Sequence, residues 1–412
     1  MKRLMLAFAV AMAFALHLGA VTLTVDAVTQ RYPWNGLVDI DYTITLGEGE
    51  DAFTADDAIK VTVTDADQEP AKTYHPLVFL QNGLPVSAGK HRITWDANAE
   101  GVTFVSQHAT ATLEIVHYPA EYCIVTISEG PTATSYPVEY RNTVPEGDFN
   151  TAEYKGDKIV LRRIRPGCFY MGSPTTEKEH QANEVLHFVA LSNSFYVGLF
   201  EVTQKQWLNV MGGDNPSAYP GDYRPVEQVT YWNIRGQYNS WPGNPKPAEA
   251  SFLGQLSKRT GLSFDLPTEA QWEFACRAGT VTPFNDNYPG TTFEHYNASI
   301  KKLGRARGNQ TDGKGDPAYD TAHTSVGGYQ ANAFGLYDMH GNVAELCRDT
   351  YEADLTTLGQ VIEPAGPSAS GSKTIRGGHW DCADQSCRSA WRASQLVGNT
   401  NKNVGFRLAL LP

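Results

Sequence analysis

Two of the chain's six cysteines, Cys382 and Cys387, lie close together near the C-terminal end. They fall in the stretch GGHWDCADQSCRSAWR (residues 377–392), where His379 stands three positions before the first cysteine. Thiolates are soft ligands that suit Cu(I) and zinc, and in an oxidising compartment two thiols can instead form a disulfide. This stretch therefore predicts a structural disulfide, a zinc half-site or a thiolate pair for a redox metal.

The three alternatives differ in what they require of the rest of the chain. A disulfide needs the turn to bring the two Cα atoms within about 7 Å of each other. Zinc would take His379 with both cysteines and a fourth ligand from elsewhere, because no other Cys/His pair in the chain has zinc spacing. Cu(I) needs only the two thiolates and an open side for a third ligand.

Composition and motifs argue against several other functions. The formal net charge is −12 and no basic run occurs, which argues against nucleic acid or an anionic membrane as a partner. The sequence has no HExxH, GxSxG or Walker-type motif, so the enzyme classes that use them are not indicated. The loop GNQTDGKGDPAYD (308–320) offers carboxylates and carbonyls to calcium, but a solvated turn-rich loop has the same composition.

The first twenty residues, MKRLMLAFAVAMAFALHLGA, read as a signal peptide. Lys2 and Arg3 precede an apolar run from Leu4 to Leu16, and small residues follow. This run is too short to span a membrane, and no second hydrophobic stretch follows it. The pattern predicts a secreted or periplasmic protein with no membrane span, whose cysteines meet an oxidising compartment.

Residues 21–118 are expected to form the first domain. In LVDIDYTITL, hydrophobic residues alternate with polar ones, which is typical of a strand with one buried and one wet face; the hydrophobic set is Val38, Ile40, Tyr42, Ile44 and Leu46. Similar strands near residues 60, 93 and 113 are separated by turn-rich breaks. This spacing predicts an antiparallel β-sandwich of immunoglobulin-like size that serves as a spacer or docking module.

A Pro- and Gly-rich stretch over residues 119–157 is expected to be a linker to a second domain at 158–412. The second domain mixes short strands with long loops and few helices, an α+β pattern that usually needs ions or disulfides to hold its loops.

Two helices position parts of this second domain. In LPTEAQWEFACRAGT, Thr268 and Gln271 have the spacing of a capping box, and Gly279 is expected to end the helix. A second helix is expected from Pro247 to Arg259, closed by Gly261.

Seven segments occur in one order along the second domain: FYMGS (169–173), FEVTQKQW (200–207), RPVEQVTYWN (224–233), LPTEAQWEFACRAGT (266–280), NAFGLYDMHGNVAEL (332–346), RGGHWDCADQSCRSAWR (376–392) and VGFRLAL (404–410). Together they resemble the formylglycine-generating enzyme family, also called the sulfatase-modifying factor domain. The resemblance covers essentially all of residues 158–412. It implies a C-type-lectin-like α+β fold with little regular structure and bound calcium.

The resemblance also implies a chemistry. Active members use copper and O2 to convert a cysteine in an unfolded sulfatase peptide to formylglycine, and Cys382 and Cys387 match their two cysteines. The chain departs from those members at four positions. His379 and Ser386 stand where they carry serine and tyrosine, and Ala344 and Leu346 stand where they carry tryptophans. The family's oxygen and substrate pocket is lined by the groups that are replaced.

The resemblance further implies a calcium site in LYDMHGNVAE. Asp338 and Glu345 match the side-chain ligands, and the carbonyls of Met339, Gly341 and Val343 match the others. Asp338 replaces an asparagine that some members carry, which keeps an oxygen ligand for a hard cation.

The sequence leaves the function between two readings. One is formylglycine generation at Cys382 and Cys387. The other is a non-catalytic lectin-like binding or scaffold role, because exposed aromatic groups are good anchors at interfaces. In either reading the substrate or ligand contacts are expected from the same loop, at His379, Trp380, Ser386 and Trp391.

The remaining four cysteines are expected to be structural. Cys276 lies on the capped helix and Cys347 follows the calcium motif. Cys123 and Cys168 bracket the expected linker, and a bond between them would tie it to the second domain.

Overall fold

The structure is a computed structural model of the whole chain. It describes residues 21–32, 35–46, 57–80, 87–117, 120–237, 246–288, 292–307, 322–355, 361–364, 366–367 and 371–410. The expected signal peptide (1–20) and the expected calcium loop (308–320) lie outside these residues. The chain divides into two compact units, one of residues 1–119 and 166–168 and one of residues 120–165 and 169–412.

The first unit consists of two three-stranded sheets, ordered β1-β2-β5 and β4-β3-β6. Their strands are β1 (Val21–Gln30), β2 (Leu37–Leu46), β3 (Asp57–Asp65), β4 (Lys72–Tyr74), β5 (Gly89–Asp96) and β6 (Ala109–His117). The expected alternation in β2 is confirmed, since Val38, Ile40, Tyr42 and Ile44 are all almost fully buried. They share one core with Trp95 and with residues of the other sheet. An immunoglobulin-like strand arrangement stays a prediction.

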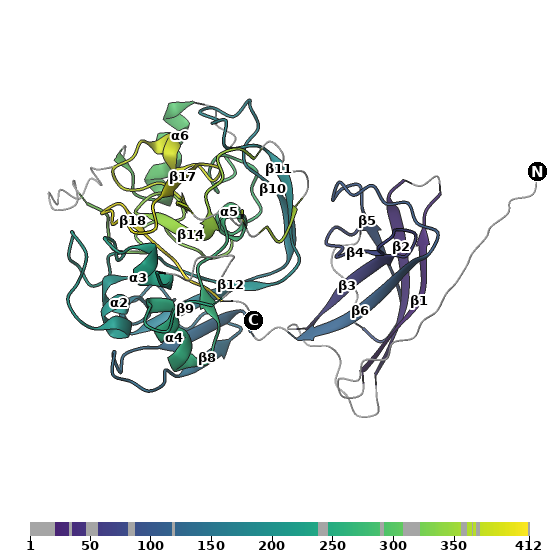
Figure 1. Cartoon of the computed structure of the whole chain (residues 1–412), viewed down its shortest axis with the longest axis horizontal. Coiled ribbons are helices and arrows are strands. Elements are labelled where there is room, and N and C mark those ends of the chain that lie inside the picture. Colours follow the sequence, from purple (N-terminus) through teal and green to yellow (C-terminus); the bar gives the residue numbers. More distant parts are fainter. Residues whose placement is uncertain are drawn as a thin grey trace, which may run out of the picture. The chain divides into compact units, whose positions relative to one another are not determined.

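The second unit is built on three sheets, drawn in Figure 1. The largest has the order β13-β19-β12-β9-β7-β8, and the others have the orders β17-β16-β14-β18 and β10-β11-β15. The strands are β7 (Tyr122–Thr126), β8 (Val138–Arg141), β9 (Lys158–Ile164), β10 (Gly167–Met171), β11 (His187–Leu191), β12 (Phe195–Gly198), β13 (Phe264–Asp265), β14 (Ala344–Thr350), β15 (Val361–Ile362), β16 (Lys373–Arg376), β17 (Arg392–Gln395), β18 (Val404–Gly405) and β19 (Ala409–Leu410). Many short strands and few helices confirm the expected mixed fold.

The expected linker over residues 119–157 is corrected by the largest sheet. Strand β7 pairs with β9 along its whole length, and β8 pairs with β7. Cys123, Val125 and Ile127 are fully buried in the main core of the second unit. Residues 120–157 are therefore part of that unit. Their Pro- and Gly-rich turns lie between strands instead of between domains.

Six α-helices are described in the second unit: α1 (Ala152–Gly156), α2 (Gln204–Met211), α3 (Tyr231–Arg235), α4 (Phe252–Thr260), α5 (Glu269–Arg277) and α6 (Phe293–Leu303). The capping box of Thr268 and Gln271 at the start of α5 is confirmed. Helix α4 begins five residues later than expected, because Ser251 caps it, and Gly261 ends it in the left-handed conformation as expected. Among the described residues, no helix is long and apolar enough to cross a membrane.

Buried ion pairs join distant segments of the second unit. Arg388 pairs with Glu177 and Glu184, and Arg392 pairs with Glu269, at 2.6–2.7 Å. Each links residues more than a hundred positions apart, and both arginine side chains are almost fully buried. The loops are thus held by charge pairs that are costly to break, because removing one partner leaves a buried charge alone.

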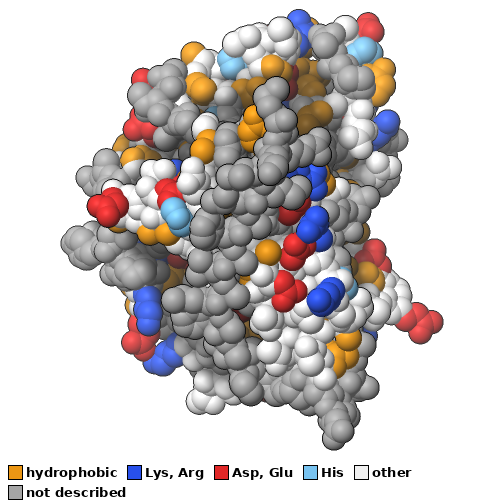
Figure 2. All heavy atoms as spheres, turned by 90° about the vertical axis from the view of Figure 1, so that its right-hand side faces the viewer, with side chains coloured by type: hydrophobic (Ala, Val, Ile, Leu, Met, Phe, Trp, Pro, Cys, Tyr) orange, Lys and Arg blue, Asp and Glu red, His pale blue; other side chains and the backbone are white. Residues whose placement is uncertain are grey.

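Charged side chains on the surface show no segregation by sign on the face drawn in Figure 2. Basic and acidic groups are interspersed there among the described residues, with hydrophobic side chains scattered between them. On that face, the described residues form no basic patch of the kind that nucleic acid would need.

Candidate functional site

The loop between β16 and β17 brings Cys382 and Cys387 together. Their sulfur atoms are 3.5 Å apart. The chain leaves β16 through Gly377 and Gly378, both with positive φ (+89° and +71°), and returns through the short 3-10 helix η2 (Asp384–Cys387). A Cβ atom on Gly378 would lie 2.7 Å from the sulfur of Cys387. The second glycine is therefore required both by its backbone conformation and by the sulfur packed against it.

The two cysteines are thiols in this structure, as are the other four. A disulfide would hold the sulfur atoms at about 2.05 Å, well below the observed separation. Cys382 is half-buried and Cys387 is fully buried. Cys382 is thus the less buried of the two and packs against the apolar cluster that contains Cys387. The disulfide expected between Cys123 and Cys168 is not formed either.

The two thiols differ in their acidity. A hydrogen bond with Cys387 lowers the pKa of Cys382, and the backbone N–H of His379, 3.1 Å from the sulfur, acts in the same direction. Burial raises the pKa of Cys387 well above its usual value. Cys382 is therefore the better thiolate, and Cys387 is the donor that stabilises it.

The buried side of the pair is apolar. Cys387 belongs to a cluster of aromatic and aliphatic side chains, three of which come from α6. The other members of the cluster are Phe284, Tyr296, Ile300, Leu303 and Ala306. Behind it, His340 Nδ1 lies 2.7 Å from the carbonyl oxygen of Cys387, so this nitrogen carries the proton. Burial lowers the pKa of His340 to about 4 and keeps it neutral. Sequence reasoning did not connect His340 with the cysteines, since the residue lies inside the expected calcium motif.

The four residues expected to bind substrate differ in how far they are buried. His379, Ser386 and Trp391 are half-buried on the loop. Trp380 is only 4% exposed, and its ring packs edge-on against Tyr219, so the expectation of an exposed anchor at Trp380 is corrected.

The histidine of this loop does not complete a metal site. Burial lowers the pKa of His379 to about 4, and its ring Nδ1 accepts the backbone N–H of Asp381. Within the described part of the chain, no group of three or more His, Cys, Asp or Glu side chains could hold a metal ion. The zinc set expected from His379, Cys382 and Cys387 is therefore not assembled there.

The two positions that lack the family's tryptophans lie in the core. Ala344 and Leu346 in β14 are 0% and 1% exposed and pack in the main hydrophobic cluster. Ala344 pairs with Val404 of β18 and donates its N–H to the carbonyl of Asn403. Position 344 therefore lies inside the core and not on an open surface.

The expected calcium ligands lie in a buried cluster of three carboxylates. Asp338 Oδ2 accepts the N–H of Gly327 at 2.5 Å, while the buried Oδ1 has no hydrogen-bond partner among the described residues. Glu345 pairs through both oxygens with Arg407 at 2.6 Å and also accepts the indole N–H of Trp272. Glu345 is thus engaged by a guanidinium, which the sequence did not predict.

Glu201 is the third carboxylate of this cluster. It accepts the N–H of Val343 and the side-chain amide of Asn342, and it is fully buried. Burial, followed by the charges of Asp338 and Glu345, raises its pKa well above the usual value. The pKa of Asp338 is raised to about 6, chiefly by burial.

Positive charge in this cluster falls short of the negative charge. Arg407 and the half-buried Lys155 oppose three carboxylates. A hard divalent cation would relieve this excess, and Asp338 Oδ1 is an oxygen that could receive it. Glu345 Oε1 accepts only one hydrogen bond and keeps a lone pair. These side chains therefore offer oxygen ligands and negative charge, but within the described residues they do not form a group of three that could hold a metal ion.

The other cysteines are buried away from solvent to different degrees. Burial raises the pKa of Cys123 and Cys276 to about 12, and that of Cys168 to about 11. Cys347 is fully buried and its pKa is likewise raised by burial. None of the four is near the thiolate form at neutral pH.

Comparison with known proteins gives relatives of the second unit. Residues 146–411 match the family described as sulfatase-modifying factor enzyme 1-like domain. The chain is 33% identical over 185 residues to Chaperone protein LppX of Paenibacillus barcinonensis, covering 39% of this chain and 63% of that protein. It is 28% identical over 270 residues to formylglycine-generating enzyme of Streptomyces coelicolor, covering 61% and 76%.

A solved structure shares the fold. PvdO from Pseudomonas aeruginosa has a TM-score of 0.50 and 24% identity, and the match covers 61% of this chain and 94% of that one. The chain spans less than two thirds of the length of the first relative named above.

Proposed function

Because the chain belongs to the sulfatase-modifying factor enzyme 1-like family, we propose that it oxidises a peptide cysteine to formylglycine. Copper would be held by Cys382 and Cys387. The observation that supports this is the pair of thiol sulfurs 3.5 Å apart, on a half-buried and a fully buried cysteine. The relative from Streptomyces coelicolor carries the same activity in its name.

The residues of the loop would act by holding two thiolates in one place. Copper, when bound, supplies the one-electron chemistry that O2 requires. Cys382 is the more acidic thiol and is half-buried at the edge of the apolar cluster that contains Cys387. His340 fixes the carbonyl of Cys387, and Gly378 leaves room for its sulfur. The chain thus presents soft ligands at the bottom of a site with one open side.

The overall reaction needs an external reductant. Converting a cysteine to an aldehyde with release of hydrogen sulfide removes two electrons, and reducing O2 to water takes four. Two equivalents of a thiol supply the other two electrons and leave as a disulfide. The products are formylglycine, hydrogen sulfide, one water and the disulfide.

Substrate contacts are proposed at the half-buried residues that flank the cysteines, His379, Ser386 and Trp391. An extended peptide would bring its cysteine thiol to the open side of Cys382. A folded sulfatase would not reach it, so the substrate is proposed to be an unfolded segment.

The test is copper binding and turnover in matched variants. Wild-type protein should bind one Cu(I) and, with a thiol reductant, convert a cysteine peptide to the aldehyde. Cys382→Ser and Cys387→Ser should each lose copper and at least about a hundredfold in rate, because each removes one ligand. Cys168→Ser changes a half-buried cysteine outside the loop and should retain both. Full turnover by either loop variant would refute the proposal.

A second candidate is binding without oxidation. It is favoured by the replacements in the loop, where His379 and Ser386 stand in place of the family's serine and tyrosine. Protein that binds peptide but consumes no O2 when loaded with copper would establish it.

Calcium is proposed as a structural ion at the carboxylate cluster, with Asp338 as its first ligand. Glu345 and Glu201 would contribute charge, and the carbonyls of Met339, Gly341 and Val343 would complete the set. Its effect would be to stabilise the native state.

A further inference from the structure

A cavity of about 350 Å³ lies in the second unit and shares no residue with the loop 377–391. Its walls come from β11, the start of α5 and the C-terminal end of β14, with further residues at 352, 354–355, 361, 364 and 366–367. This volume is at the lower end of the range of small-molecule sites. It would admit a metabolite but not a peptide.

The first polar group in its wall is the carboxyl of Asp349, which is 3% exposed. Its Oδ2 accepts the backbone N–H of Glu269 at 2.8 Å. No described residue donates a hydrogen bond to its Oδ1. This oxygen is therefore available to accept a hydrogen bond from a donor in the cavity. Burial and the charge of Glu269 raise the pKa of Asp349 to about 7.

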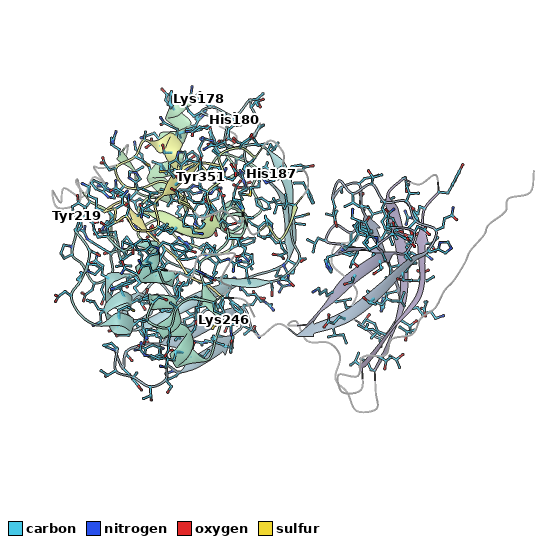
Figure 3. The ribbon with its side chains drawn as sticks, viewed as in Figure 1. Lys178, His180, His187, Tyr219, Lys246 and Tyr351 are labelled. Atoms are coloured by element: carbon cyan, nitrogen blue, oxygen red, sulfur yellow. The ribbon has the colours of Figure 1, made fainter. Side chains whose placement is uncertain are left out.

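The second polar group is His187, which is 7% exposed and is labelled in Figure 3. Its Nδ1 lies 2.7 Å from the carbonyl oxygen of Val185, so Nδ1 carries a proton. In the neutral ring Nε2 is then an acceptor. No described residue pairs with this Nε2. The cavity therefore presents a second acceptor.

Arg392 also lines the cavity, but its donors are used inside the protein. Nε and Nη2 donate to the two oxygens of Glu269 at 2.7 and 2.6 Å, and Nη1 donates to the carbonyls of Asn183 and Glu352. The charge of Glu269 is neutralised by the same contact. An anionic ligand would thus find no free guanidinium among the described lining residues.

What remains is a set of acceptors beside an apolar wall that includes Met171, Ala270 and Leu355. We propose that this cavity binds a small organic amine, with its ammonium group on Asp349 and its apolar body against that wall. A primary ammonium carries three donors, which suits the open Oδ1 of Asp349 and Nε2 of His187. The proposal is independent of copper chemistry at the cysteine pair.

The experiment compares three probes of one shape on the full-length protein. Phenethylamine is the amine, 2-phenylethanol its neutral counterpart and 3-phenylpropionate its anionic counterpart. Phenethylamine should raise the unfolding temperature by several degrees at millimolar concentration and give a calorimetric binding signal. The alcohol and the acid should do neither. Equal effects of amine and alcohol would overturn the proposal, since the cavity would then recognise only the ring.

Two variants locate the effect. Asp349→Asn keeps an oxygen for the N–H of Glu269 and should lose the response to phenethylamine. Ala270→Leu fills the cavity from α5 and should also lose it. Asp214→Asn changes an exposed carboxylate outside the cavity and should keep the full response. If Asp349→Asn does not fold, the result for Ala270→Leu decides the question. An unchanged response to phenethylamine in either folded variant would refute the site.

Discussion

The cysteine pair and the carboxylate cluster are both matched to metals by the family's motifs, but they differ in what they lack. The sulfurs of Cys382 and Cys387 are already side by side, and one thiol stabilises the other. The carboxylates of Glu201, Asp338 and Glu345 are buried with too little positive charge around them. The thiol pair is complete without a metal, whereas the carboxylate cluster is not.

This difference separates two uses of a bound ion. A thiol pair is uncharged when protonated, so the fold does not depend on its metal. Buried carboxylates repel one another and must be paired or protonated. Copper should therefore affect activity alone, while calcium should affect stability.

The largest expected effect is that of calcium removal. An ion present at 100 to 1000 times its Kd stabilises the native state by about 3–4 kcal/mol, which is several degrees in the unfolding temperature. Chelation should cause this loss in the wild type, measured by calorimetry. On chelation, the unfolding temperature of Asp338→Asn should fall by less than that of the wild type. The control Asp214→Asn, at an exposed position, should show the full wild-type fall. An unchanged unfolding temperature after chelation would rule the calcium site out.

The pH dependence of the calcium-free protein sharpens this test. The pKa of Asp338 is about 6 in the folded protein, above its usual 3.8, and that of Glu201 is raised too. The folded state then holds protons that the unfolded chain has released, so stability should fall as pH rises from about 4 through 6. Calcium keeps both groups ionised and should flatten the slope. Equal slopes with and without calcium would contradict the model.

Several secondary-structure elements could be predicted from the local sequence. The alternation in β2 and the capping box of Thr268 at α5 depend on neighbouring residues, and both are confirmed. The spacing of Cys382 and Cys387 indicated that the two sulfurs lie close together, and they are 3.5 Å apart. These signals are local, so no knowledge of the distant chain is needed.

The missed features depend on contacts between distant segments. The pairing of β7 with β9 was hidden because a short strand among turn residues resembles a linker. Trp380 is packed against Tyr219, and Glu345 forms an ion pair with Arg407. In each pair the partner is more than sixty residues away in the sequence. Such pairs are set by the fold as a whole and leave no periodic signal.

The next largest effect concerns position 344. Restoring the family's tryptophan with Ala344→Trp should destabilise the protein, because the side chain of Ala344 is fully buried beside β18. Overpacking of this kind costs about 1–3 kcal/mol or more. His379→Ser and Ser386→Tyr, at half-buried positions, should cost less than about 1 kcal/mol. Denaturant unfolding would measure all three. A neutral Ala344→Trp would show that the core opens next to Glu345.

The last effect is the most specific test of the cysteine pair. Gly378 and Gly213 have nearly the same φ, +71° and +75°. A Cβ on Gly378 would lie 2.5 Å from the backbone carbonyl oxygen of Ser386 and 2.7 Å from the sulfur of Cys387, whereas a Cβ on Gly213 would meet nothing within 4 Å. Both alanine variants should lose about 1 kcal/mol from left-handed strain, and Gly378→Ala should lose more through the contact. Only Gly378→Ala should also lose Cu(I) affinity, measured by competition with a chelator, because the added methyl must displace the backbone of Ser386 and the sulfur of Cys387 that follows it. Equal copper affinity in the two variants would mean that the 3.5 Å spacing of the sulfurs does not matter for binding.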